Sequence, residues 1–412
     1  MPRCVEVRNR FRDASTVSSP PARPTMMDAV KLALVGVVLL LLGGIAIALG
    51  GLPAEDALAI ADRVWPILLF VVAVTIVAEL AAAAGVFDVA AFALARLGNG
   101  RTWALWALVV LLATAATAFL SLDTTAVLLT PVVVAVARAH RLDPLPFAFT
   151  TVVLANTASL VLPVSNLTNL LAVERLGFDD PLSFLTLLGP SALVAIVVSA
   201  GLLYAVHHRS LAGRYSPAPA PRIENRALLA TATGVVLLLM PLLVSGMPPW
   251  IPAAAAALVL LVVFAWQSPR TLRVRLVPWQ LVVFASGLFL AVGAVEALGS
   301  QQIVEAVTGT GGSLASLLQL AGVGVLGANA LNNLPAYLAL EAAARAPERL
   351  AALLVGVNAG PLITPWASLA TLLWHQRLHA MGVDVPWRQY VLFGLVAAPL
   401  TVVLAVLPLA QR

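Results

Sequence analysis

The chain has 412 residues, of which 61% are hydrophobic and only 10% are charged. Its mean hydropathy of +0.99 excludes an ordinary soluble globular domain and predicts an integral membrane protein. The net charge of +5 comes from arginines in short loops between apolar runs, where basic residues set membrane orientation, so it does not indicate a nucleic-acid partner.

The N-terminal stretch, residues 1–27, is polar and arginine-rich and lacks the apolar core of a signal peptide. We expect a disordered cytoplasmic tail, with Met26 or Met27 as alternative start sites. Beyond it, apolar runs long enough for membrane-spanning helices recur to the C-terminus, which predicts an all-α polytopic membrane protein. They fall at 28–51, 64–85, 102–138, 144–173, 183–206, 227–246, 249–266, 278–298, 313–342, 349–375 and 388–410.

Two of these runs, 102–138 and 313–342, are long for one crossing and carry polar residues in the middle. The first has basic loops at both ends, which places both ends on the cytoplasmic side. It is therefore predicted to be a re-entrant hairpin with its tip at Asp123. By the same rule 313–342 enters from outside, with its tip at Asn332 and Asn333.

Two further runs, 144–173 and 349–375, resemble each other. Asn156 and Asn358 are 202 positions apart, and Pro163 and Pro365 share that offset. We interpret this as an inverted repeat with two halves, and the proline-rich segment between them as a cytoplasmic linker. The division is a first half at 28–206, a linker at 207–226 and a second half at 227–412.

Prolines in the middle of both runs predict two broken helices. At membrane depth such breaks are tolerated where they line a cavity, and in inverted-repeat transporters they build the substrate site. The alternative is a structural role, in which these hydroxyls and amides only form hydrogen bonds between helices, each contributing about 0.6 kcal/mol of stability. The predicted substrate residues are Thr124, Thr125, Asn156, Ser165, Asn166, Asn332, Asn333, Asn358, Thr364 and Ser368.

Asp123 is the most informative acid, because a carboxylate inside a membrane segment is costly unless it is paired or protonated. We interpret it as the group that carries a proton during transport. The alternative is a capping role, in which Asp123 accepts N–H bonds from Thr125 or Ala126 at the start of the returning helix.

Several other classes of site are disfavoured. Cys4 is the only cysteine and Lys31 the only lysine, which excludes intrachain disulfides, thiolate metal sites and a phosphate-binding loop with its lysine. His375 and His379 have the spacing of helical metal ligands, but no third ligand is evident. We expect no cofactor, no metal and no enzymatic activity. Uphill transport would then use an ion gradient or a separate ATPase.

The sequence resembles the arsenite efflux permease family, the membrane subunit of arsenical pumps, within the ion transporter superfamily that also holds dicarboxylate and citrate carriers. The stretches that carry the resemblance are "FLSLDTTAVLLTPVV" (119–133), "LANTASLVLPVSNLTNLL" (154–171), "NNLPAYLALE" (332–341) and "GVNAGPLITPWASLATLLWH" (356–375). The resemblance implies export of arsenite or antimonite across the cytoplasmic membrane, coupled to proton entry or to a soluble partner ATPase.

The superfamily's sodium-coupled dicarboxylate carriers have Ser-Asn-Thr motifs at their hairpin tips. This chain has Leu-Asp-Thr and Asn-Asn-Leu instead, which argues against sodium coupling and a carboxylate substrate. The polar set also lacks Arg and Lys, so an anion would be neutralised only by helix dipoles and amides. The alternatives left open are an ion-coupled carrier of an organic or inorganic anion, a passive channel, and a scaffold for a soluble ATPase.

Overall fold

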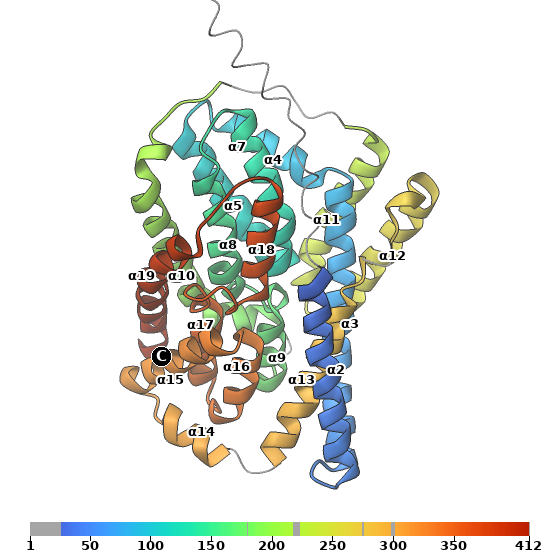
Figure 1. Ribbon diagram of the computed structural model, residues 1–412, viewed down its shortest axis with the longest axis vertical. Coiled ribbons are helices and arrows are strands. Elements are labelled where there is room, and N and C mark those ends of the chain that lie inside the picture. The colour runs from blue at the N-terminus through green and yellow to red at the C-terminus, as the bar shows by residue number, and fades with distance from the viewer. Residues whose placement is uncertain (1–25, 179, 217–222, 274–275, 298–300, 412) are drawn as a thin grey trace, which may run out of the picture.

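The computed structural model describes residues 26–178, 180–216, 223–273, 276–297 and 301–411 (Figure 1). Most of the expected tail at 1–27 and part of the linker at 207–226 lie outside these ranges. Within them the regular elements are helices, with one isolated β-bridge. The all-α fold expected from the sequence is confirmed.

The described ranges contain nineteen helical elements of four or more residues, from α2 to η8, with the short α6 and 3-10 turns between some of them. In chain order the elements used below are α2 (Met26–Ala48), α3 (Ala54–Ala83), α4 (Val86–Leu97), α5 (Thr102–Leu120), α6 (Leu122–Thr124), η2 (Thr125–Leu129), α7 (Thr130–Ala139), α8 (Leu145–Thr157), η3 (Ala158–Leu160), η4 (Pro163–Ser165), α9 (Leu167–Leu176), α10 (Pro181–Leu211), α11 (Arg226–Leu243), α12 (Trp250–Gln267), α13 (Trp279–Ala297), α14 (Gln301–Thr308), α15 (Leu314–Ala330), α16 (Asn333–Leu340), η7 (Glu341–Ala343), α17 (Pro347–Ala359), α18 (Leu369–Ala380), α19 (Trp387–Val406) and η8 (Leu407–Gln411).

Eight helices in the described ranges are long and apolar enough to cross a membrane. They are Ala54–Ala83, Thr102–Leu120, Leu122–Ala139, Pro181–Leu211, Arg226–Leu243, Trp250–Gln267, Trp279–Ala297 and Trp387–Gln411. This number of spans makes the chain a multi-pass membrane protein, because each apolar helix satisfies its own backbone hydrogen bonds in lipid.

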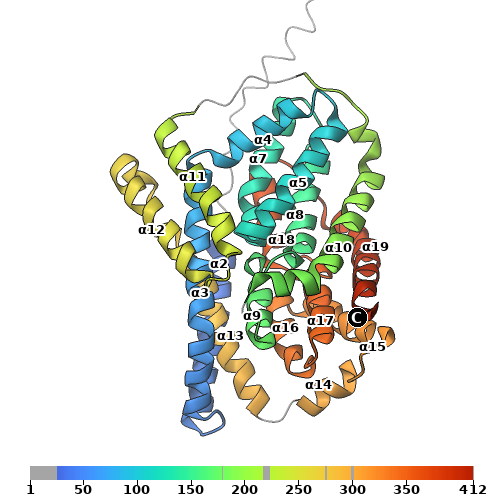
Figure 2. The same ribbon diagram turned by 180° about the vertical axis from the view of Figure 1, so that it is seen from behind.

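A slender group of helices forms one side of the molecule. It contains α2, α3, α11, α12 and α13, with α2 packed along α13 and α12 along α3 (Figures 1 and 2). Glycines allow the closest of these contacts: a Cβ on Gly287 would lie 2.4 Å from the carbonyl oxygen of Gly36. Small residues at such crossings let the backbones of membrane helices approach. We call this group the slender body.

The remaining long helices form a larger body around α8 and α17. Helix α10 packs on α8 and α19, and α15 packs on α17. Residues 146–157 of α8 and 349–359 of α17 are all buried. Their uninterrupted burial places the two helices that precede the predicted breaks in the centre of the larger body.

Both breaks are present. After α8, the chain passes through η3 and η4 before α9 begins at Leu167, and after α17 it leaves helical geometry until α18 begins at Leu369. Pro163 is the first residue of η4, a position where its missing N–H is not required.

Both hairpins are present as well. Helix α5 turns back at Ser121 and α15 at Leu331 and Asn332. In Figure 1 the first hairpin opens toward the end where α4 lies, and the second toward the opposite end, near α14. Ser121 (φ 108°, ψ 160°) and Asn332 (φ 148°, ψ 162°) share a backbone conformation that is rare for residues with a side chain. The same turn therefore occurs at both tips.

Candidate functional site

The first break is closed by local hydrogen bonds. The Ser165 hydroxyl donates to the carbonyl of Leu162 (2.6 Å) and accepts from its N–H (3.2 Å), which folds the chain around Pro163. The Asn169 amide donates to the carbonyls of Ser159 (2.6 Å) and Leu162 (3.0 Å). Carbonyls freed by the break are thus satisfied by side chains, and Ser165 is used in the turn itself.

Asn358, near the end of α17, joins the second broken helix to the first. Its Oδ1 accepts from the Asn166 amide and from the Thr168 hydroxyl, both at 2.9 Å, and its Nδ2 donates to Oδ1 of Asn169 at 2.7 Å. Asn358 is 1% exposed. We call Asn166, Thr168, Asn169 and Asn358 the amide cluster.

The amide cluster is built from groups without formal charge. Amides and hydroxyls both donate and accept, so these buried groups can make hydrogen bonds of both kinds, and in this structure they bond to one another. A buried cation or anion would need a counter-charge there, and none of the four residues provides one. The chemistry of the cluster therefore favours a small, neutral, hydroxyl-rich ligand.

Asn156 occupies the position in the first half that corresponds to Asn358, but its contact differs. Its Nδ2 donates to the Val152 carbonyl one turn earlier in the same helix (2.9 Å). Its burial is nearly complete, at 2% exposure. Asn156 therefore bonds within its own helix, whereas the equivalent Asn358 bonds to another helix.

Hydrogen bonds of Asn329 connect the second break to the tip of the second hairpin. Its Oδ1 accepts from the Thr364 N–H (2.9 Å), and its carbonyl accepts from the Thr364 hydroxyl (2.9 Å) and the Trp366 indole (2.8 Å). Its Nδ2 donates to the Gly360 carbonyl (2.9 Å). Asn329 lies three residues before the predicted tip at Asn332 and Asn333, yet it was absent from the predicted set.

The two predicted tip residues reach the same break. The Asn332 amide donates to the Trp366 carbonyl (2.9 Å), and the Asn333 N–H donates to the Ala367 carbonyl (3.0 Å). Ser368 follows directly and is 0% exposed, and its hydroxyl has no hydrogen-bond partner among the described residues. A buried hydroxyl without a partner is uncommon and marks a place where a ligand or a water would be stabilised.

The first tip is bonded differently. The Thr124 hydroxyl donates to the Leu120 carbonyl (3.0 Å), and the Thr125 hydroxyl contacts that of Thr117 (2.9 Å). Both contacts stay inside the first hairpin. A π-helical segment, η2, begins at Thr125, and such segments occur frequently at functional sites.

Asp123 does not cap the returning helix, because the cap is Ser121, whose hydroxyl accepts from the Thr124 N–H (3.3 Å). Asp123 is partly buried, and in the described part of the chain its carboxylate has no hydrogen bond or ion pair. The cap is thus assigned to Ser121 and not to Asp123, and the role of Asp123 in transport stays a prediction.

The structure therefore separates the predicted residues into four groups. Asn166 and Asn358 meet in the amide cluster, and Thr364, Asn332 and Asn333 meet at the second break. Thr124 and Thr125 bond within the first hairpin, while Asn156 and Ser165 bond within their own segment. Thr168, Asn169 and Asn329 were missed, although all three lie within stretches that carried the sequence resemblance or marked a hairpin tip.

An ion-pair cluster around Arg63 was also missed. The apolar run was expected to begin at residue 64, but α3 begins at Ala54, so Arg63 lies inside the helix. Its guanidinium contacts Glu341 (2.9 Å), which is 4% exposed, and pairs with Glu174. Because α3 belongs to the slender body while α9 and η7 belong to the larger one, this cluster links the two bodies.

Comparison with known proteins gives consistent matches. The sequence profile of the citrate transporter family matches residues 25–371. An arsenical pump membrane protein of Yersinia enterocolitica is 30% identical, over 85% of this chain and 87% of its own length. The arsenical pump membrane protein of Escherichia coli K12 is 32% identical, over 81% and 83%.

A solved structure matches the fold. The YdaH transporter of Alcanivorax borkumensis, described as having an unusual topology, superimposes with a TM-score of 0.60 over 93% of this chain and 97% of its own. The sequence identity is 16%, so this likeness bears on the arrangement of the helices alone.

Proposed function

Because this chain belongs to the citrate transporter family and is 30% and 32% identical to two arsenical pump membrane proteins over 85% and 81% of its length, we propose that it exports trivalent arsenite and antimonite in exchange for protons. The observation that carries the proposal is the amide cluster at the junction of the two broken helices. The membrane concerned would be the cytoplasmic membrane.

The proposed substrate suits the cluster. Near neutral pH arsenite is the uncharged trihydroxide, a small molecule whose hydroxyls both donate and accept hydrogen bonds. Asn166 and Asn358 would bind it in this way, with the Ser368 hydroxyl as a further partner. Cys4, the only cysteine, lies in the N-terminal tail, so the cargo would be held reversibly and not by thiolates.

Proton coupling would use Asp123. A carboxylate at a hairpin tip that has no counter-ion among the described residues can bind a proton on one side of the membrane and release it on the other. Binding a proton would remove a charge that is costly in a low-dielectric setting. A soluble ATPase, where one is present, would dock on the arginine-rich loops at 207–226 and 267–277.

The alternative is an ion-coupled carrier of an organic or inorganic anion. The description of the matched family, which names citrate, favours it. The composition of the amide cluster argues against it, because an anion bound there would lack an arginine or lysine partner.

A cellular assay distinguishes arsenite export from transport of an anion. The chain is expressed in a bacterium that lacks its own arsenic exporters, and cell-associated arsenic is measured after exposure to arsenite. The proposal predicts lower arsenic content than in vector controls, with Asn358→Ala restoring the vector level. Unchanged arsenic content together with altered citrate uptake would favour the anion carrier instead.

A further inference from the structure

Two arginines from distant parts of the chain are paired through their backbones at the end of the molecule that holds α4. Arg101 precedes α5 and Arg214 follows α10, and their backbones form an isolated antiparallel bridge. The bridge is closed by two hydrogen bonds, from Thr102 N–H to the Gly213 carbonyl (3.1 Å) and from Tyr215 N–H to the Gly100 carbonyl (2.9 Å).

This bonding pattern makes Arg101 and Arg214 a non-hydrogen-bonded pair, whose Cα atoms in such ladders lie about 4.5 Å apart with side chains on the same face. Like charges directly opposite each other destabilise an antiparallel pair. Within the described ranges neither guanidinium has a carboxylate partner or a hydrogen bond. Both positively charged side chains therefore line one cavity, and the described part of the chain supplies neither of them with a compensating group.

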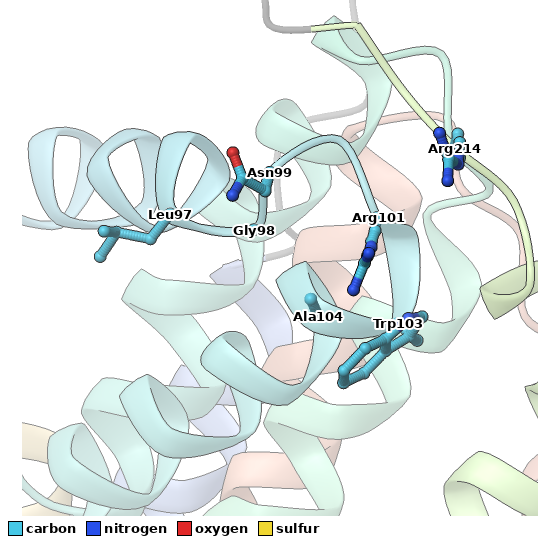
Figure 3. Close-up of a pocket in the computed structure, with 7 residues that line it drawn as sticks. All are labelled: Leu97, Gly98, Asn99, Arg101, Trp103, Ala104 and Arg214. Atoms are coloured by element: carbon cyan, nitrogen blue, oxygen red, sulfur yellow. The ribbon is translucent and has the colours of Figure 1, made fainter.

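The pair borders a cavity of about 360 Å³. Figure 3 shows its lining: Arg101 extends from the loop toward Trp103, while Arg214 comes from the neighbouring segment. The Arg101 side chain makes no cap hydrogen bond at the start of α5, so its guanidinium is not used by the helix that follows it.

The floor of the cavity is held rigidly. Gly98 lies against Tyr215, where an added Cβ would come within 2.5 Å of the phenol oxygen, and that hydroxyl donates to the Ala95 carbonyl (2.5 Å). The bridge between Arg101 and Arg214 is thus tied to the end of α4 as well as to α5 and α10. Preorganised donors of this kind lower the cost of ordering side chains around a ligand.

The rim of the cavity carries exposed apolar side chains. Leu97 is 69% exposed and Trp103 48% exposed, and α4 lies across this end of the molecule (Figure 1). The arginine-rich loops predict, by the positive-inside rule, that the same end faces the cytoplasm. Aromatic side chains at the headgroup level and basic side chains in the inner leaflet are typical of contacts with anionic lipids.

We propose that Arg101 and Arg214 bind the phosphate group of an anionic inner-leaflet phospholipid. The bidentate geometry of guanidinium and phosphate satisfies both arginines, and the acyl chains would run along the exposed apolar surface beside Trp103 and Leu97. A free phosphate ion would use the same guanidinium groups but would leave that apolar surface uncovered.

The test measures lipid retention by native mass spectrometry on the full-length protein in detergent, titrated with phosphatidylglycerol or phosphatidylcholine. Arg101→Gln and Arg214→Gln are compared with Arg209→Gln, a control in the last turn of α10 that does not line the cavity. The expected result is preferential retention of phosphatidylglycerol, weakened about fivefold by each cavity substitution and unchanged by the control.

The bridge uses backbone atoms, so glutamine at either position should preserve it, and equal unfolding temperatures without lipid would verify this. Equal retention of the two lipids, or equal losses in Arg209→Gln, would overturn the proposal. Stabilisation by inorganic phosphate alone to the level reached with phosphatidylglycerol, abolished by the double substitution, would assign the site to a free anion and overturn the lipid assignment.

Discussion

Asn358 makes hydrogen bonds to three different residues of the first broken helix. Its position could be predicted from the sequence, because the repeat pairs it with Asn156. Its partners could not, because a pattern along one helix does not reveal which side chains a distant segment brings to it. The same limit explains why Thr168, Asn169 and Asn329 were missed.

Replacing Asn358 with Ala should destabilise the protein more than replacing Asn156 with Ala. The first change leaves Asn166, Thr168 and Asn169 without their buried partner, at a cost of about 1–3 kcal/mol for each group left unsatisfied, whereas the second removes one bond within a helix. Thermal unfolding in detergent measures the difference. Equal losses would mean that the amide cluster does not join the two helices.

Asp123→Asn removes the titratable proton but keeps the size and polarity of the side chain. The account predicts that substrate still binds while gradient-driven export is lost. Binding is followed by calorimetry and export in vesicles. Proton-dependent export at the wild-type rate would exclude Asp123 as the coupling group.

At the scale of elements, the hairpins and broken helices were predictable because polar residues and prolines interrupt apolar runs. The ends of the elements were harder to predict. Helix α3 shows the reason, because its acidic first turn and Arg63 resemble a loop in sequence, although the helix includes them. Ion pairs with Glu174 and Glu341 allow the arginine to lie within the helix, and those partners become visible only in the fold.

Because the Arg63 cluster links the two bodies, we expect substitution of Arg63 to weaken the contact between them strongly. Arg63→Gln leaves the 4%-exposed Glu341 carboxylate without its partner, and breaking a buried pair typically costs about 3–5 kcal/mol. Arg345→Gln is the matched control, because the Arg345–Glu305 pair is exposed and such pairs contribute about 0–1 kcal/mol. Denaturant unfolding should separate the two variants, and similar midpoints would contradict a structural role for Arg63.

The turn at Ser121 gives a test of backbone strain. Its φ of 108° is rare for residues with a side chain and costs on the order of 1–3 kcal/mol. Ser121→Gly and Ser121→Ala both remove the hydroxyl cap of α6, but only glycine relieves the strain. The glycine variant should therefore unfold at the higher temperature, and the opposite order would show that the turn is unstrained.

At the scale of the whole molecule, the slender body and the larger body meet where α3 contacts α6, η2 and α9, and where α13 contacts α16. Both hairpins reach this boundary, as Figures 1 and 2 show from opposite sides. This division follows from packing and was not readable from the sequence, whose repeat instead divides the chain into consecutive halves. We propose that the division into two bodies and the division into two sequence halves are compatible, because each half contributes helices to both bodies.

The most direct test of proton-coupled arsenite export uses everted vesicles that contain the purified protein and no ATP. The account predicts that arsenite accumulates when the vesicle interior is made acidic, that a protonophore abolishes accumulation, and that sodium has no effect. Absence of accumulation by folded protein, or accumulation that requires sodium, would contradict it.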